Sequence, residues 1–212
     1  MKYNSGNFDK YMTRNPLKRE MVSRLNDRIL HLVQNSMAVR QNAQCDSSVA
    51  KILDAGCGEG FISNLIFRNC KDVEITGLEY TEEALQIARE MNPLATFVQG
   101  DIAKMPFASR SFDIVLCTEV LEHLADPLAA LAELLRVAKG ALIITVPHEP
   151  WFRMGNMLVL KNVTRFGNPI DHINHWTFTG FKSFLNKNTE VSWTVEKSFP
   201  WTVAYCAKSN EE

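Results

Sequence analysis

The sequence lacks a surplus of charge of either sign, because 23 lysines and arginines stand against 24 acidic residues in a chain of 212. This balance argues against a nucleic-acid partner, since a phosphate backbone is bound by a basic surface. Long apolar runs are also missing, and the longest, at 141–146, is far too short to cross a bilayer. The N-terminal residues contain no apolar signal core. We therefore expect a cytoplasmic protein with no transmembrane segment.

Paired cysteines are lacking too. The 5 cysteines are widely spaced and form no C-x-x-C pair, and Cys57 and Cys117 lie in glycine-rich or apolar stretches. This distribution predicts free thiols in a reducing compartment. With 46% apolar and 22% charged residues, the composition is ordinary for a globular protein, and the length suits one domain with a sizeable core.

Strand-like and helix-like segments alternate from residue 49 onward. The expected strands are 50–56, 73–79, 95–101, 112–118 and 140–147, and the expected helices are 60–70, 81–91 and 127–138. Parallel strands need crossover connections, so this alternation predicts a doubly wound, Rossmann-like α/β sheet. After a further helix at 177–188, the segments 190–198 and 200–208 predict an antiparallel hairpin at the sheet edge.

Two segments lie outside this alternation. Residues 17–35 have apolar side chains at three- or four-residue spacing, which predicts an amphipathic helix. We expect a single domain with an N-terminal helical cap over 1–48 and a main unit over 49–212. Inside the main unit, 147–176 is rich in aromatic residues and histidine and has no clear period. An inserted lid over a ligand pocket is the interpretation we favour, and an apolar membrane contact is the alternative.

The segment LDAGCGEG, at 53–60, joins the first expected strand to the first helix. It has a G-x-G-x-G pattern, formed by Gly56, Gly58 and Gly60. Glycines let a ligand approach the backbone at a helix N-terminus. A dinucleotide-binding oxidoreductase would have its third glycine one residue later, where this chain has Phe61. The acidic residues Asp54 and Glu59 disfavour a pyrophosphate and suit a ligand with a cationic part.

Acidic residues also follow the next two expected strands. Glu79 ends the second strand about 20 residues beyond the glycine turn, where an acid can accept hydrogen bonds from both hydroxyls of a ribose. Asp101 follows the third strand and is placed to contact an adenine amino group. Ribose and adenine recognised without phosphate, beside a turn that tolerates positive charge, indicate S-adenosylmethionine.

Four segments carry a family resemblance: ILDAGCGEG, GLEYTEEALQIA, QGDIAKMPF and SFDIVLCTEVLEHLADP. In this order they resemble the motifs of class I S-adenosylmethionine-dependent methyltransferases, over residues 49–147. The resemblance implies a seven-stranded sheet with an antiparallel last strand, glycines along the methionine portion, and acids at the ribose and adenine. The residues expected at the cofactor are Tyr11, Asp54, Gly56, Gly58, Gly60, Glu79, Tyr80, Asp101, Ile102 and Thr118.

Two carboxylates and an imidazole follow the fourth expected strand, at Glu119, Glu122 and His123. On a helical turn, three- and four-residue spacing places them on one face. The carboxyl end of a strand is also where open α/β sheets bind ligands. A second cluster, at 168–177, adds His172 and His175. Carboxylates suit Mg²⁺ or Mn²⁺, and imidazoles extend the range to Zn²⁺ or Fe²⁺.

The E-x-x-E-H pattern resembles that of ubiquinone-pathway O-methyltransferases, in which it is associated with a divalent metal. Small-RNA 2′-O-methyltransferases look similar there and add a D-H-x-x-x-W histidine, which 171–176 matches except that Asn174-His175 replaces Phe-Glu. The resemblance implies a metal site for Mg²⁺ or Zn²⁺, with ligands Glu119, Glu122, His123 and His172. Without a metal, His123 or His172 is the expected catalytic base.

The expected function is therefore S-adenosylmethionine-dependent O-methylation of a small-molecule hydroxylated acceptor, with possible assistance from a metal. A metal would favour acceptors with two neighbouring hydroxyls. The alternative is a non-catalytic regulatory protein that binds S-adenosylmethionine. The intact acids and histidines of the two clusters favour chemistry over regulation.

Overall fold

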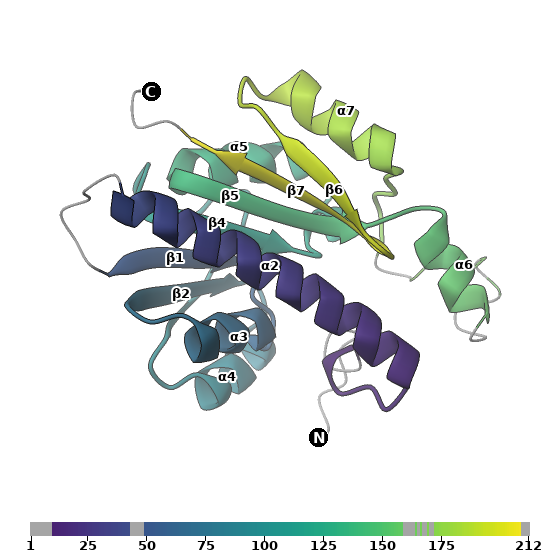
Figure 1. The fold of residues 1–212 in the computed structure, drawn as a ribbon, viewed down its shortest axis with the longest axis horizontal. Coiled ribbons are helices and arrows are strands. Elements are labelled where there is room, and N and C mark those ends of the chain that lie inside the picture. Colours follow the sequence, from purple (N-terminus) through teal and green to yellow (C-terminus); the bar gives the residue numbers. More distant parts are fainter. Residues whose placement is uncertain are drawn as a thin grey trace.

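The computed structural model describes residues 10–42, 49–158, 164, 166, 169 and 172–208. A seven-stranded sheet of order β3-β2-β1-β4-β5-β7-β6 forms its centre (Figure 1). The strands are β1 (Ala50–Ala55), β2 (Val73–Glu79), β3 (Thr96–Gln99), β4 (Phe112–Thr118), β5 (Ala138–Pro147), β6 (Thr194–Ser198) and β7 (Trp201–Ala207). From β3 to β5 the strands are parallel, whereas β7 runs antiparallel to both β5 and β6. The Rossmann-like sheet and its antiparallel edge hairpin are thus confirmed.

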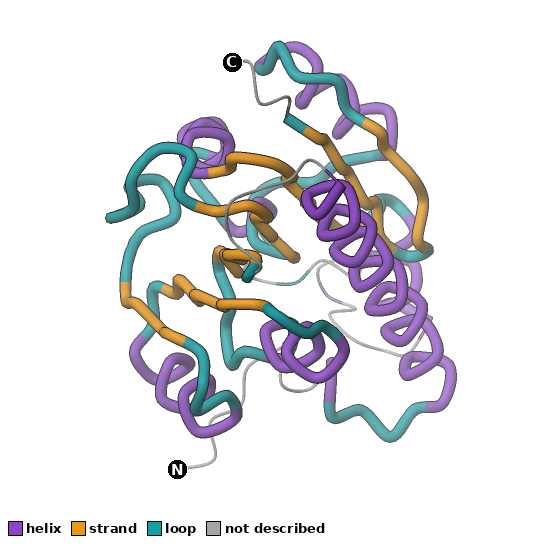
Figure 2. The backbone as a smooth tube through the Cα atoms, turned by 60° about the vertical axis from the view of Figure 1, so that its left-hand side comes forward, coloured by secondary structure: helices purple, strands orange, loops and turns teal. Residues whose placement is uncertain are grey.

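The helices cover both faces of this sheet (Figure 2). They are α2 (Pro16–Asn42), α3 (Phe61–Asn69), α4 (Glu82–Met91), α5 (Pro127–Val137), α6 (Trp151–Leu158) and α7 (Phe178–Asn188), with a short 3₁₀ helix, η1 (Leu121–His123). The N-terminal helix continues well beyond the predicted end at 35. Its last turns contain Met37, Ala38 and Arg40, which are good helix formers.

Alternate residues of the central strands pack into two separate cores. Ile52 and Ile114 face α2 and α3, whereas Leu53 and Val115 face α5 and α7. This is the period of two expected for strands that are covered on both faces. Because Leu25 and Ile29 of α2 are almost fully buried, the N-terminal helix is a layer of the core itself.

The four described cysteines are free and buried, so the predicted free thiols are confirmed for that part of the chain. Cys45 lies outside the described residues. Burial raises the pKa of Cys117 well above its ordinary value and raises the pKa of Cys206 to about 12. Thiols of this kind are poor nucleophiles at neutral pH, so they serve the packing.

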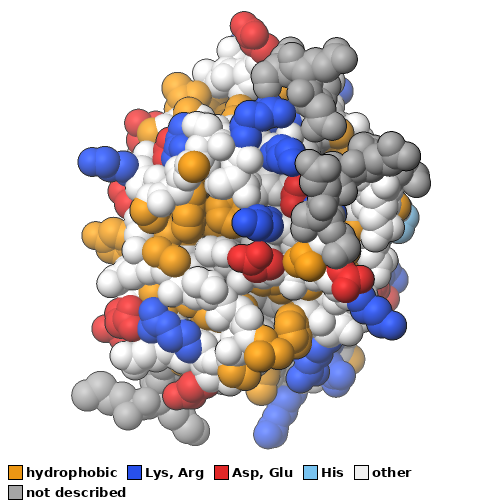
Figure 3. All heavy atoms as spheres, turned by 90° about the vertical axis from the view of Figure 1, so that its left-hand side faces the viewer, with side chains coloured by type: hydrophobic (Ala, Val, Ile, Leu, Met, Phe, Trp, Pro, Cys, Tyr) orange, Lys and Arg blue, Asp and Glu red, His pale blue; other side chains and the backbone are white. Residues whose placement is uncertain are grey.

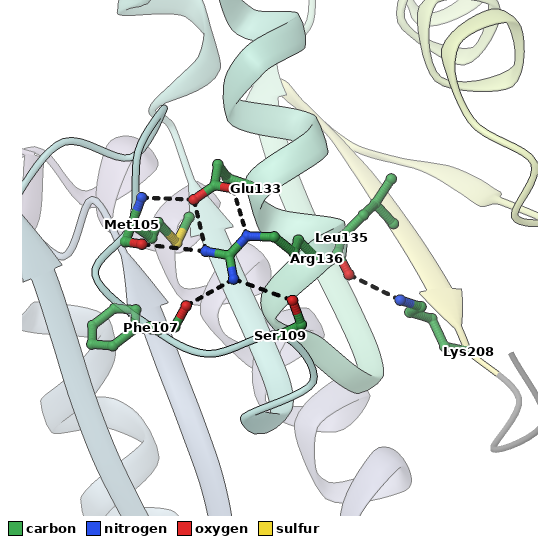
Figure 4. A network of polar contacts seen from close by, with 7 residues as sticks. All are labelled: Met105, Phe107, Ser109, Glu133, Leu135, Arg136 and Lys208. Carbon is green, nitrogen blue, oxygen red and sulfur yellow. Dashed lines mark hydrogen bonds and ion pairs between the residues drawn. The ribbon is translucent and has the colours of Figure 1, made fainter.

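A polar network holds the loop that leads from β3 to β4 (Figure 4). The backbone N–H of Met105 donates to Glu133 at 2.7 Å, and Arg136 donates to the carbonyls of Phe107 at 2.8 Å and Met105 at 3.2 Å. The hydrogen bond from Arg136 lowers the pKa of Glu133. Helix α5 thereby fixes the loop that begins at Asp101, one of the expected cofactor residues.

The surface seen from the left-hand side of Figure 1 carries acidic and basic side chains interspersed with apolar ones (Figure 3). Within the described residues, no helix has the length and apolar character needed to cross a bilayer.

Candidate functional site

A cavity of about 680 Å³ opens where β1, β2 and β4 end. In a parallel sheet these ends share one edge, so residues far apart in the sequence meet there. The walls come from the N-terminal segment, the glycine turn, the loops after β2, β3 and β4, and the segments around Phe152 and His172. The expected cofactor residues on these walls are Tyr11, Gly56, Gly58, Glu79, Tyr80, Asp101, Ile102 and Thr118.

The glycine turn needs its glycines for two reasons. All three have positive φ values, between 52° and 79°, which side chains with a Cβ rarely adopt. A Cβ on Gly56 would also lie 2.4 Å from Cγ2 of Val120, and one on Gly60 would lie 2.7 Å from the amide nitrogen of Asn92. Gly56 therefore lets the turn press against the loop after β4, whereas Gly60 faces α4 and is absent from the cavity walls.

Asp54 lies beneath the turn and is absent from the cavity walls. It is fully buried and accepts a hydrogen bond of 2.7 Å from the Ser63 hydroxyl. Burial raises the pKa of this carboxyl to about 6. Any effect of Asp54 on a cofactor would therefore act through the field of its charge or through the shape of the turn.

Glu79 is held in place by the residues around it. Its Oε2 accepts the N–H of Gly58 at 3.1 Å, and its Oε1 accepts both the N–H and the hydroxyl of Thr81 at 3.0 Å. Thr81 occupies the N-cap position of α4, but its side chain makes no hydrogen bond to the helix. The hydroxyl instead fixes the carboxylate at the cavity wall.

The loop after β4 differs from the helical turn predicted for it. Only Leu121–His123 is helical, as the 3₁₀ turn η1, and Glu119 precedes it with a left-handed φ of 59°. Ligand atoms of Glu122, His123 and His172 all lie within 4.8 Å of one another. Glu119 is not in this group, and its Oε2 pairs instead with the Lys10 ammonium at 2.7 Å. The structure thus groups three of the four expected metal ligands.

His172 reaches this group because its segment is attached to the η1 turn. The N–H groups of Ile173 and Asn174 donate to the Glu122 carbonyl at 2.8 and 2.9 Å. The Asn174 amide donates to the carbonyls of Leu121 at 3.0 Å and Leu124 at 2.7 Å. As a result, the rings of His123 and His172 meet edge to face, with centroids 4.8 Å apart.

His175 lies apart from the group. Its Nδ1 is 3.8 Å from Oε1 of Glu149, which lies two residues beyond the end of β5. Burial lowers the pKa of His175 and raises that of Glu149. The Glu149 N–H also donates to the Trp176 carbonyl at 3.0 Å, so this pair holds the base of the expected lid. Asp171 lies outside the described residues.

Sequence reasoning missed Lys10 and Asn174. Lys10 is 8% exposed and lines the cavity beside Tyr11, which stacks on Phe61 with centroids 4.5 Å apart. No local pattern marks Lys10, since its partner Glu119 is 109 positions away. For Asn174 a signal existed, in the Asn-His that replaces the Phe-Glu of the RNA enzymes.

Comparison with known proteins gives consistent results. Residues 53–144 match the methyltransferase domain family. A probable S-adenosylmethionine-dependent methyltransferase of Mycobacterium tuberculosis is 32% identical over 106 residues, which is 49% of this chain and 38% of that protein. The ubiquinone biosynthesis O-methyltransferase of Vibrio cholerae is 31% identical over 94 residues, which is 42% of this chain and 38% of that enzyme. The matched part is therefore less than half of either relative.

A solved structure has the same fold over nearly the whole chain. The plantazolicin methyltransferase BpumL, in complex with a pentazolic desmethylPZN analog and SAH, superposes with a TM-score of 0.66. The sequence identity is 16%, and the match covers 95% of this chain and 94% of that chain.

Proposed function

We propose that this chain is a class I S-adenosylmethionine-dependent methyltransferase, which its similarity to that family supports, and that it transfers the cofactor's methyl group to a hydroxyl of a small acceptor. The observation that carries the proposal is a single cavity shared by two sets of residues. One set matches the family's cofactor motifs, and the other is the group of Glu122, His123 and His172.

The cofactor is proposed to lie along the ends of β1 and β2. The glycine turn would face its methionine portion, Glu79 its ribose, and Asp101 with Ile102 its adenine. The fixed position of the Glu79 carboxylate supports this arrangement, because a preoriented acceptor loses little entropy on binding. The carboxylates on the cavity walls would also favour a cationic sulfonium.

Methyl transfer from a sulfonium is an in-line displacement with a good leaving group. The protein's tasks are to align the acceptor oxygen with the methyl and to remove the hydroxyl proton. His123 or His172 would take that proton on a ring nitrogen, while the methyl moves from sulfur to oxygen and the neutral thioether leaves. An imidazole suits this step because its ordinary pKa is near neutrality. The buried carboxylate of Glu122 would orient the imidazoles and stabilise the positive charge that the base acquires.

The same group of residues fits a divalent metal. One carboxylate and two imidazoles are a donor set typical of Zn²⁺, Fe²⁺ or Mn²⁺, whereas Mg²⁺ prefers oxygen ligands. We propose Glu122, His123 and His172 as ligands, without Glu119, whose carboxylate is paired with Lys10. A bound metal would lower the pKa of an acceptor hydroxyl that it contacts.

Calorimetry followed by a transfer assay tests the function. We expect both S-adenosylmethionine and S-adenosylhomocysteine to bind with one-to-one stoichiometry. A labelled methyl group should then move to members of a panel of catechols, sugars and nucleosides, with and without a chelator. Failure to bind either nucleoside, or transfer to amines alone, would refute the proposal.

Titration with Co²⁺ tests the metal separately, through the visible absorption of the bound ion. We expect His172→Ala to lose the absorption and His175→Ala to keep it, since only the first residue belongs to the group. Equal spectra for the two variants would refute this set of metal ligands and would leave the proposal of methyl transfer standing.

A further inference from the structure

Lys10 and Glu119 form an ion pair inside the cavity. The Lys10 ammonium is 2.7 Å from Oε2 of Glu119, and the two side chains are only 10% and 18% exposed. Aromatic rings surround the ammonium, with centroids at 4.8 Å for Trp201 and 5.2 Å for Tyr11. Within the described residues, Oε1 of Glu119 accepts no hydrogen bond. Lys10 is therefore the principal compensation for this carboxylate.

The charge state of Lys10 follows from the same contacts. Burial lowers the pKa of Lys10, but attraction to Glu119, to the Tyr11 oxygen and to Glu122 outweighs it, so that the pKa is above its ordinary value. The ammonium is thus charged throughout the physiological range. A buried ammonium in direct contact with a carboxylate of the same cavity neutralises that carboxylate.

The pair lies close to the place proposed for the reacting sulfur. Glu119 is flanked by Thr118 and Val120, all three of which line the cavity. A Cβ on Gly56 would overlap Val120, so the loop after β4 touches the glycine turn at this point. With the nucleoside at Glu79 and the methionine portion at the turn, the sulfonium would lie between them, beside Glu119.

A bare carboxylate at this position would oppose the reaction. The sulfonium carries a full positive charge in the reactant and none in the thioether product, so a nearby anion stabilises the reactant more than the transition state. Such an anion would tighten the binding of the methyl donor without accelerating transfer. A lysine paired with the carboxylate removes this effect.

We propose that Lys10 is a positioning residue that holds and neutralises Glu119 beside the methyl donor, and so limits the cavity's preference for the sulfonium over the thioether. This inference rests on the proposed function, because it requires that S-adenosylmethionine binds in this cavity. It assigns to the N-terminal segment a role that none of the family motifs contains.

The test is the ratio of two dissociation constants, for S-adenosylhomocysteine and for S-adenosylmethionine, measured by calorimetry. In Lys10→Met the ratio should rise at least about tenfold, which is about 1.4 kcal/mol. In Glu119→Gln it should fall about fivefold, because Lys10 is then uncompensated. The double variant and the charge-conserving Lys10→Arg should both stay within about threefold of the wild type.

The ratio of the two dissociation constants is insensitive to a merely structural role of Lys10, since loosening of the N-terminal segment would weaken the binding of both ligands alike. If Lys10→Met does not fold, Glu119→Gln still tests the proposal through its opposite sign. Unchanged ratios in both single variants, with both nucleosides bound, would overturn the inference and leave the proposed function intact. Failure of the wild type to bind either nucleoside would refute both the inference and the proposed function.

Discussion

The two halves of the cavity are built in different ways. In the half proposed for the cofactor, hydrogen bonds join residues close in sequence, such as Gly58 with Glu79, 21 positions apart, and Ser63 with Asp54, 9 apart. In the half proposed for the acceptor, Asn174 contacts Leu121 across 53 positions, and Lys10 contacts Glu119 across 109. The first half follows from one β–α–β unit, whereas the second requires the whole chain to be folded.

This difference implies that the halves can be separated experimentally. A change at His123 or His172 in the acceptor half should affect chemistry and leave cofactor binding intact, while a change in the glycine turn should affect both. Their point of contact is Gly56 against Val120, so substitutions there should couple them.

The largest effect is expected from His172→Ala in the acceptor half. Loss of a general base or metal ligand should reduce kcat by about 10²–10⁴-fold. The dissociation constant for S-adenosylhomocysteine should stay within about threefold, because His172 is not among the residues proposed to contact the cofactor. His31→Ala, on the exposed side of α2, is the matched histidine control and should leave both quantities unchanged. Parallel loss of binding and activity would show that the halves are not separable.

Gly56→Ala should have the next largest effect, because it disrupts the contact of Gly56 with Val120, where the two halves meet. A left-handed φ and an overlap with Val120 together should cost about 2–4 kcal/mol in the free energy of unfolding. Gly155→Ala is the matched control, since a Cβ there meets nothing within 4 Å in helix α6. It should stabilise the protein by about 0.5–1 kcal/mol. Urea denaturation measures both, and a cost below about 1 kcal/mol for Gly56→Ala would mean that Val120 can move aside.

The same contrast explains what could be predicted from the sequence. Strands and helices of the central sheet follow from residue periodicity, and the edge hairpin at β6 and β7 follows from two strand-like runs with a short turn. The glycine turn and Glu79 are recognisable from the sequence because their separation along the chain determines how close they lie in the folded structure. Each of these features depends on contacts within about 30 residues, the size of one β–α–β unit.

Features that depend on distant contacts were missed or altered. The helical face expected for Glu119, Glu122 and His123 assumed regular helix from the first of these residues, but Glu119 is left-handed and paired with Lys10. Lys10 itself precedes every motif and has no local signal. Asn174 stood out only as a departure from a related pattern, and its role became visible when its segment met the η1 turn.

Asp54→Asn tests the buried charge beneath the cofactor half. Burial raises the pKa of Asp54 from 3.8 to about 6, so the unfolded chain releases this proton at lower pH than the folded protein does. Stability is therefore lost as pH rises from about 4 to about 6, and the loss persists above that window. An asparagine never ionises and can still accept from Ser63.

The variant should accordingly be more stable than the wild type by about 1–3 kcal/mol at neutral pH, and the difference should shrink toward pH 4. Thermal or urea unfolding across this range measures it. A difference that does not vary with pH would show that Asp54 is not the group responsible. Asp113→Asn is a matched control in which the partly exposed acid is paired with Arg40, and it should not be stabilised.

Asn174→Leu should have the smallest effect of the four and is the sharpest test of how the acceptor half is assembled. The leucine has the same number and branching of heavy atoms but cannot donate to the carbonyls of Leu121 and Leu124, which should lower the free energy of unfolding by about 1–2 kcal/mol. If the amide also holds His172 beside His123, kcat should fall about tenfold with unchanged affinity for S-adenosylhomocysteine. Asn188→Leu removes a similar amide bond, to Phe184 at the exposed end of α7, and should reduce stability only. Full activity in a destabilised Asn174→Leu variant would mean that the backbone hydrogen bonds to Glu122 are sufficient to place His172. The acceptor half would then be held together by its main chain more than by its side chains.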